Sequence, residues 1–265
     1  MQIAGYIASL IIGISLGLIG GGGSILTVPV MVYLFNVQPL LATSYSLFVV
    51  GSTSLFGAAS NYAKGFVNIN TALLFGLSSI ATVFLTRKFV IPFIAGLSVN
   101  VGGVIITEPM FTMLLFAVLM VLAAVSMIRK TKYSVIAIPR ARNINVTRLL
   151  LYGVAIGFIT GLLGAGGGFL LIPTLAIVVG LPMKEAVGTS LLIIALNSLI
   201  GFTGDLGHFI INWSLLLKVT AIAVTGIFIG GALAKKIPGE NLKKGFGWFV
   251  LAMGIYIIIK EIFFH

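Results

Sequence analysis

The sequence contains no cysteine and little charge. Without cysteine the chain has no disulfide, no thiol nucleophile and no thiolate metal site. Charged residues make up 8% of the 265 residues, whereas a soluble domain has about a quarter. Five residues are acidic and two are histidine, and they form no acid–base dyad, carboxylate cluster or histidine pair in the sequence. We therefore expect no enzyme, no metal site and no cofactor.

Long apolar stretches fill most of the chain. Hydrophobic residues make up 59% of the sequence and the mean hydropathy is +1.22. Stretches such as 110–128 and 213–234 are long enough to cross a hydrocarbon core, which takes roughly 20 residues. We expect an all-α polytopic membrane protein with about 7–9 membrane-spanning segments.

The net charge of +11 comes from lysines and arginines that gather between apolar stretches. Such clusters mark the cytoplasmic ends of spanning segments and favour contact with anionic lipids over a nucleic-acid partner. We therefore expect a protein of the plasma membrane whose basic linker, 129–148, lies in the cytoplasm. The two main clusters are Arg129, Lys130, Lys132, Arg140, Arg142 and Arg148, and Lys235, Lys236, Lys243 and Lys244.

Two glycine clusters stand 144 residues apart, each inside an apolar stretch and each followed by a proline. Many identities recur at this spacing, which indicates a duplicated unit. We expect two tandem repeats, 1–128 and 149–265, joined by the basic linker within a single membrane domain. The clusters are Gly20, Gly21, Gly22, Gly23 and Ser24, and Gly164, Ala165, Gly166, Gly167 and Gly168; the prolines are Pro29 and Pro173.

Each glycine cluster should break its helix, because glycine leaves helical backbone readily. In the first repeat a helix should end near Gly17 or Gly20, and another should start between Ser24 and Val28. If each broken segment forms a re-entrant hairpin, the basic loop 235–244 lies in the cytoplasm with the linker. The residues 87–88 then form a cytoplasmic loop before an extra apolar segment, 89–107. If both hairpins are re-entrant, the two repeats have the same orientation in the membrane. Inverted repeats are the alternative.

The glycine turns are the predicted ligand site. New helix starts present free N–H groups and the positive end of the helix dipole, which suits an anion. Neither cluster is followed by the Lys-Ser/Thr pair of a nucleotide-binding P-loop. The alternative role is close helix packing, which we expect for Gly13, Gly17, Gly157 and Gly161.

Small polar side chains follow each hairpin. Hydroxyl and amide groups can replace the hydration shell of an anion, although Ser and Thr in membrane helices also bond to their own backbone. Asp205 and His208 fall in a predicted outer loop, where we expect a solvated pair, and gating or proton transfer is the alternative role. The other substrate-binding candidates are Thr43, Ser44, Ser46, Thr189, Ser190 and Asn197.

Several stretches match a known family: 17–29, 161–173, 42–44, 186–191 and 235–238. Through them the sequence resembles the sulfite exporter TauE/SafE family of membrane permeases. The resemblance implies export of small sulfur-containing anions, namely sulfite and organosulfonates, with the glycine turns and polar side chains as the anion site. Residues 43–46 are Thr-Ser-Tyr-Ser, whereas residues 187–190 are Val-Gly-Thr-Ser, so the two half-sites should differ.

We therefore predict a secondary transporter that works by alternating access around the two turns. The alternatives are an anion channel and, less favoured, an intramembrane enzyme, which would need a nucleophile and a base at membrane depth. The only histidines, His208 and His265, lie near the ends of apolar segments. The expected partners are a small anionic substrate and membrane lipids. The sequence does not specify the anion, the coupling ion or the oligomeric state.

Overall fold

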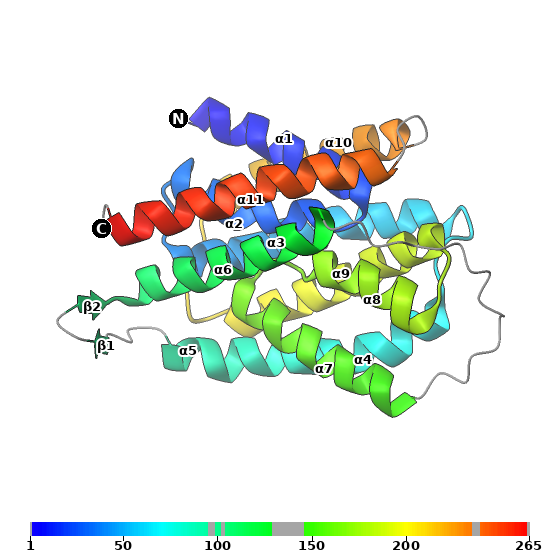
Figure 1. The fold of residues 1–265 in the computed structure, drawn as a ribbon, viewed down its shortest axis with the longest axis horizontal. Helices are drawn as coiled ribbons and strands as arrows, with labels where there is room; N and C mark the ends of the chain where they lie inside the picture. The colour runs from blue at the N-terminus through cyan, green and yellow to red at the C-terminus, as the bar shows by residue number, and fades with distance from the viewer. Residues whose placement is uncertain (1, 95–98, 102–103, 129–145, 235–238, 264–265) are drawn as a thin grey trace.

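The chain forms a bundle of long helices with one small β-hairpin (Figure 1). The computed structural model describes residues 2–94, 99–101, 104–128, 146–234 and 239–263. In chain order the elements are α1 (Gln2–Ile19), η1 (Gly22–Leu26), α2 (Thr27–Tyr33), α3 (Pro39–Tyr62), α4 (Ile69–Leu85), η2 (Thr86–Val90), α5 (Ile91–Ile94), β1 (Val99–Val101), β2 (Val104–Ile106), α6 (Glu108–Ile128), α7 (Val146–Leu163), α8 (Gly168–Thr174), η3 (Leu175–Val179), α9 (Met183–Asp205), α10 (Trp213–Leu233) and α11 (Gly239–Phe263). The strands are antiparallel, with Val99 opposite Ile106 and Val101 opposite Val104.

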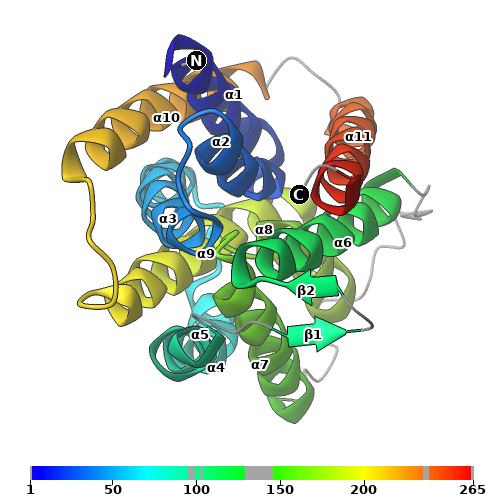
Figure 2. The ribbon, with the colours of Figure 1, turned by 90° about the vertical axis from the view of Figure 1, so that its left-hand side faces the viewer.

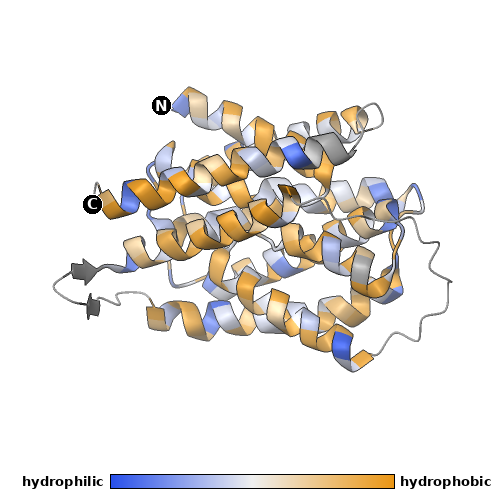
Figure 3. Ribbon diagram, viewed as in Figure 1, coloured by the Kyte–Doolittle hydropathy of each residue, from blue (hydrophilic) through white to orange (hydrophobic). Residues whose placement is uncertain are grey.

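Within the described residues, eight helices are long and apolar enough to cross a membrane. Apolar residues run along their whole length (Figure 3), and large side chains such as Leu77, Leu151 and Phe158 are exposed on the surface. An apolar exterior is expected where lipid takes the place of water, and helices satisfy their own backbone groups there. The predicted polytopic α-helical membrane protein is confirmed.

Helices recur at the spacing of the glycine clusters. The bounds of α7 lie 144 residues after those of α1, and α9 and α10 begin 144 residues after α3 and α4. The helices α4 and α10 also start in the same way. The side chain of Asn68 accepts a hydrogen bond from the N–H of Thr71 at 3.0 Å, and that of Asn212 accepts one from Leu215 at 3.1 Å. An N-cap of this kind satisfies a free N–H at the helix start.

Each glycine cluster lies at the tip of a helical hairpin. As expected for the first cluster, α1 ends at Ile19 and α2 begins at Thr27, and the 3₁₀ turn η1 lies between them. The start of α1 lies beside the segment after α2, where the ring centroids of Tyr6 and Phe35 are 5.4 Å apart. This hairpin therefore opens at one end of the bundle, while the hairpin of α7 and α8 opens at the other (Figure 1). That the hairpins are re-entrant in a bilayer stays a prediction.

The predicted loop at Arg87 and Lys88 is wrong. The helix α4 continues through η2 into α5 as one apolar span, Ile69–Ile94, so 89–107 is not a separate segment. Arg87 is buried inside the bundle, whereas Lys88 is exposed, with its ammonium over the rings of Phe84 and Phe89. Both cations are tolerated because one is paired inside the protein and the other can extend toward the interface.

The helices before the linker, α1–α6, form a first set, and those after it, α7–α11, form a second set. Loss of the extra segment reverses the expected orientation of the second set. Three spans, α3, α4–α5 and α6, follow the first hairpin instead of the four expected. An odd number of crossings puts the start of α7 at the end of the bundle opposite to the start of α1 (Figure 1). Helices 144 residues apart therefore run in opposite directions, and the expected common orientation is wrong.

Contacts between the two sets of helices are reciprocal. Near one end of α3, the N–H of Asn212 donates to Tyr45 Oη at 2.6 Å. Near the start of α9, the N–H of Asn68 donates to Thr189 Oγ1 at 2.9 Å. Thr189 and Asn212 lie 144 residues after Tyr45 and Asn68. Reciprocal contacts are what a two-fold axis produces, so the two sets are related by an approximate two-fold rotation.

The helices of one set pair with those of the other: α1 with α10, α3 with α9, α4 with α7 and α6 with α11. Glycines bring several of these pairs into backbone contact, since a Cβ on Gly13 would lie 2.0 Å from the carbonyl oxygen of Ala223. A Cβ on Gly157 would lie 2.6 Å from that of Ser79. The packing role predicted for Gly13 and Gly157 is confirmed. Seen from one end, α3 and α9 lie inside the ring of other helices (Figure 2).

Candidate functional site

The tips of the two glycine hairpins touch inside the bundle. A Cβ on Gly168 would lie 2.5 Å from the Cα of Gly21, so only glycine permits this approach. The backbone is left-handed at Gly20, Gly164 and Gly166, with φ of 75°, 67° and 67°, which other L residues rarely adopt. Every residue of both clusters is buried. The irregular backbone thus lies in the protein interior, where its polar groups can be satisfied.

A buried ion pair lies against the second glycine turn. Nη1 of Arg87 is 3.2 Å from Oδ2 of Asp205, and the two side chains are 0% and 1% exposed. The same Nη1 donates to Thr43 Oγ1 at 2.9 Å, and the hydroxyl of Ser44 donates to Asp205 Oδ2. Charges inside a membrane protein are tolerated when they are paired and hydrogen-bonded in this way. Arg87 also sits in η2, a π-helical turn, a form often found at functional sites.

Small residues make room for the guanidinium. A Cβ on Gly204 would lie 3.0 Å from the Cβ of Arg87, so α9 approaches the arginine closely. A Cβ on Gly164 would lie 2.5 Å from Nη2 of Arg87 and 2.3 Å from the carbonyl oxygen of Thr43. The arginine therefore occupies a slot between α9 and the second turn, with Nη2 beside Gly164.

The ion pair leaves polar atoms without partners. Among the described residues, Nε and Nη2 of Arg87 and Oδ1 of Asp205 are buried and make no hydrogen bond. An arginine carries five N–H donors, and here only those on Nη1 are used. Buried polar groups are nearly always satisfied, so each exception needs an explanation such as a bound ion or water. These unpartnered atoms of the ion pair are the strongest candidates for binding a ligand.

Buried hydroxyls extend this polar surface along the second turn. A Cβ on Gly166 would lie 3.1 Å from Ser198 Oγ, and one on Gly167 would lie 2.1 Å from Thr160 Oγ1. Within the described part of the chain neither hydroxyl has a hydrogen-bond partner, and the same holds for Ser46. The second turn thus combines a charged donor with free hydroxyls.

The first turn is closed by local and apolar contacts. A Cβ on Gly20 would lie 2.4 Å from Val187 Cγ1. The hydroxyl of Ser190 donates to the Gly20 carbonyl at 3.1 Å and to the Val187 carbonyl at 2.8 Å. The hydroxyl of Ser24 donates to the Gly21 carbonyl at 2.7 Å. These contacts tie α9 to the turn and are those of a packed junction.

Gly22 and Gly23 also take part in packing. A Cβ on Gly22 would lie 3.2 Å from Ile19 Cγ2, and one on Gly23 would lie 2.7 Å from the Cβ of Ser15. Both neighbours belong to α1, so these glycines fold the hairpin onto its own first helix. The structure places neither residue beside the ion pair.

Three further predicted residues lie in different surroundings. The hydroxyl of Thr189 holds the segment before α4, and the amide of Asn197 donates to Ser79 Oγ at 2.6 Å while its Oδ1 has no partner among the described residues. His208 is exposed in the loop after α9. Asp205 is buried rather than solvated, so the predicted loop pair of Asp205 and His208 is wrong.

The ion pair, which joins η2 of the first set of helices to α9 of the second, has no charged counterpart at the equivalent positions. The positions equivalent to Arg87 and Asp205 hold Gly231 and Asn61, which cannot carry a charge. In place of an ion pair, a Cβ on Gly188 would lie 3.1 Å from the Cβ of Asn61, so the helices pack directly. The two half-sites thus differ, and the charge belongs to the second turn.

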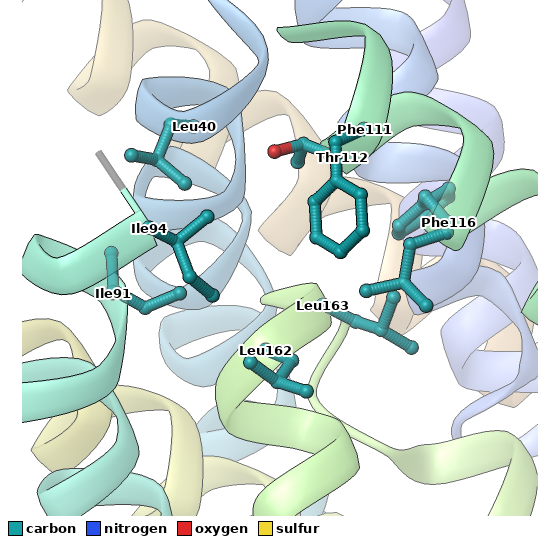
Figure 4. A pocket seen from close by; sticks show the side chains of 9 residues that line it. Leu40, Ile91, Ile94, Phe111, Thr112, Phe116, Leu162 and Leu163 are labelled. Carbon is teal, nitrogen blue, oxygen red and sulfur yellow. The ribbon is translucent and has the colours of Figure 1, made fainter. Parts of the chain in front are cut away.

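A small apolar pocket lies near the second glycine turn, since Leu162 and Leu163 line part of it (Figure 4). The carbonyl of Leu40 in its wall accepts the hydroxyl of Thr43 at 2.6 Å, and Leu163 immediately precedes Gly164. The lining offers an anion no charge, so the ion pair and not the pocket is the candidate binding site. The lining residues are Leu40, Ile91, Ile94, Phe111, Thr112, Leu115, Phe116, Leu162 and Leu163.

The sequence-based prediction did not include Arg87 among the site residues. An Arg-Lys pair at the end of an apolar stretch is typical of a loop, and the sequence analysis therefore predicts a loop at residues 87–88. The 144-residue spacing carries a contrary signal, because it matches Arg87 to Gly231, which lies within the apolar stretch 213–234. That match places Arg87 inside a helix, where a charge requires a partner.

The sequence matches a known family over nearly its whole length. A sequence model of the family described as "Sulfite exporter TauE/SafE" matches residues 6–257. A protein of Xylella fastidiosa (strain Temecula1), named "Probable membrane transporter protein", is 30% identical over 95% of this chain and 92% of its own. The "Probable membrane transporter protein YdhB" of Bacillus subtilis is 26% identical over 88% of this chain and 90% of its own. No solved structure was found to match.

Proposed function

Because the chain belongs to the sulfite exporter TauE/SafE family, we propose that it is a secondary transporter that exports a small sulfur-containing anion, such as sulfite or an organosulfonate. Family membership and eight apolar spans indicate a multi-pass membrane transporter rather than an enzyme. The proposal adds the class of substrate, the direction and the mechanism. The sulfur chemistry of the substrate comes from the family description, and its negative charge is supported by the site.

The observation that carries the proposal is the buried guanidinium of Arg87. Its Nε and Nη2 have no partner among the residues that the structure describes, and Nη2 lies beside Gly164. Charge-assisted hydrogen bonds from a guanidinium to an oxyanion are about twice as strong as neutral ones. The hydroxyls of Ser198 and Thr160 lie along the same turn. Together they form a site that can replace part of the hydration shell of an anion, while Asp205 limits the net positive charge and so allows release.

The arrangement of the hairpins supports alternating access. The two hairpins open at opposite ends of the bundle and their tips meet at Gly21 and Gly168. Two-fold related hairpins around a central site are the usual architecture of carriers that expose one site to each side in turn. The ion pair is 0% and 1% exposed, which favours a carrier with a closed site over an open channel.

We further propose that the end of the bundle next to the linker 129–148 faces the cytoplasm of a plasma-membrane protein. The two basic clusters of the sequence, within 129–148 and 235–244, connect helices whose adjoining ends lie at this end of the bundle. An excess of Lys and Arg in short loops sets the cytoplasmic side. Anionic lipids at that surface would then be the lipid partner.

Transport by the purified protein in liposomes tests the proposal. We expect saturable flux of at least one anion among sulfite, thiosulfate, sulfate and sulfoacetate, and no flux in liposomes without protein. A properly inserted protein that moves none of these anions would rule the proposed function out.

Two neighbouring substitutions test the role of the ion pair. Arg87→Gln should lower flux by about tenfold or more, since it removes the charged donor, whereas Lys88→Gln, at the exposed neighbour, should transport nearly as well as the unmodified protein. Because Arg87→Gln leaves Asp205 buried without a partner, the double variant Arg87→Gln, Asp205→Asn serves as a second, charge-neutral test. Normal flux in the folded double variant would contradict the assignment of Arg87.

A further inference from the structure

The ion pair leaves both donors and an acceptor unused. Nε and Nη2 of Arg87 can donate, and Oδ1 of Asp205 can only accept, and among the described residues none of the three has a partner. The other carboxylate oxygen, Oδ2, is held by Arg87 and by the hydroxyl of Ser44. The orientation of the carboxylate is therefore fixed, and Oδ1 is the part of it left for a ligand.

This combination selects among anions. An anion bound to Arg87 also lies close to the carboxylate of Asp205, because the two groups are 3.2 Å apart. Repulsion from that carboxylate doubles for a doubly charged anion and offsets its doubled attraction to Arg87, while the cost of removing the anion from water rises more steeply with its charge. An anion with acceptor oxygens alone would in addition leave Oδ1 buried and unsatisfied, which is unfavourable. A singly charged anion with its own O–H or N–H satisfies both partners.

We propose that the substrate is a singly charged sulfur oxyanion that also carries a hydrogen-bond donor, such as hydrogensulfite or a hydroxysulfonate, and that Asp205 selects for it. This inference rests on the proposed function, because it takes Arg87 as the anion site. It goes further by assigning Asp205 the discrimination between substrates. A site built to accept a hydrogen bond rejects an analogue that lacks the donor, since the buried acceptor is then left unpaired.

A matched pair of ligands tests the inference in the unmodified protein. Ethanesulfonate and 2-hydroxyethanesulfonate have the same charge and carbon chain and differ by one hydroxyl. In calorimetric titrations of the full chain in nanodiscs, we expect the hydroxysulfonate to bind about tenfold or more tightly. Equal affinities would overturn the selection by Asp205 and leave the transport proposal standing.

The variant Asp205→Asn provides a gain of binding that structural damage would not produce. Sulfate, a dianion without a donor, should bind at least about tenfold more tightly to the variant than to the unmodified protein, because the repelling charge is gone. The preference for the hydroxysulfonate should shrink in the same variant. Sulfate binding that is no tighter in a folded variant would contradict the inference.

The remaining outcomes separate the two proposals. If the protein transports sulfite but binds neither sulfonate, the inference about hydroxysulfonates fails while the transport function holds. If it binds neither sulfonate and transports no anion, the proposed function itself fails. The first result concerns Asp205 and the second concerns the site as a whole.

Discussion

Arg87 and Lys88 are adjacent cations in one helix with different surroundings. Successive residues of a helix point about 100° apart, so Arg87 faces α9 while Lys88 faces outward. Arg87 is stable there because Asp205 and Thr43 accept its hydrogen bonds. Removing one partner of a buried pair typically destabilises a protein by about 3–5 kcal/mol. Of these two neighbouring cations, one thus forms part of a buried site and the other lies on the outer surface of the bundle.

The two clusters differ in how strictly their positions require glycine. Gly164 has φ of 67° and lies against both Thr43 and Arg87, so any side chain there is strained and blocks the ion pair. Gly22 has no left-handed φ, and its nearest neighbour is the flexible side chain of Ile19 at 3.2 Å. The distinction is invisible in the sequence, where both are members of similar clusters.

We predict that Gly164→Ala lowers anion flux by about tenfold or more while Gly22→Ala transports nearly normally. The added methyl group at residue 164 would push Arg87 from its slot and force a left-handed alanine, at about 1–2 kcal/mol. Flux in liposomes with matched amounts of inserted protein measures the difference. Equal flux in the two variants would mean that the second turn is a packing element like the first.

The pairing of α1 with α10 shows how an element finds its place in this bundle. Lipid is as apolar as the side chains, so helices associate through close packing of small residues. A Cβ on Gly230 would lie 2.2 Å from the carbonyl oxygen of Ile14, whereas one on its neighbour Gly231 would meet nothing within 4 Å. The backbone contact thus depends on one face of α10.

At this interface we expect Gly230→Ala to destabilise the protein by about 1–3 kcal/mol, the usual effect of overpacking. Gly231→Ala should have a neutral or slightly stabilising effect, because alanine favours helix more than glycine does. Thermal unfolding of the two purified variants in the same detergent compares them. A similar midpoint for both would show that α1 and α10 are not in the close contact described.

At the scale of the molecule, the two sets of helices are inverted and interlocked. The main helix pairs each join one set to the other, and residues of both sets make up the buried core. The inversion follows from the odd number of spans after the first hairpin, which in turn follows from the burial of Arg87 in one continuous helix. One ion pair therefore bears on the topology of the whole chain.

The orientation of the two sets can be tested with cysteines, since the chain has none. Lys64 and His208 are exposed loop residues 144 positions apart. In inverted sets, Lys64→Cys and His208→Cys should react with an impermeant maleimide from opposite sides of the membrane, with Lys64 on the cytoplasmic side. Labelling of both from the same side would support the common orientation instead and overturn the arrangement described.

Composition and periodicity were enough to establish the fold class, the positions of the glycine breaks and spans such as 110–128 and 213–234. These properties are local, because a run of about 20 apolar residues must become a span and a run of glycines must interrupt it. The 144-residue spacing also pointed to the correspondence between the two sets. The packing role of Gly13 and the inequivalence of the two turns could be predicted in the same way.

The three-dimensional structure was needed to show three things. These are that α4 is continuous, that the second set of helices runs in the opposite direction, and where Arg87 and Asp205 lie. Arg87 and Asp205 are 118 residues apart in the sequence, and nothing local shows that either has a partner. A charged residue near the end of an apolar stretch is a loop residue when unpaired and a helix residue when paired. Only the packing of α9 against α4 decides between the two, and with it the topology and the site.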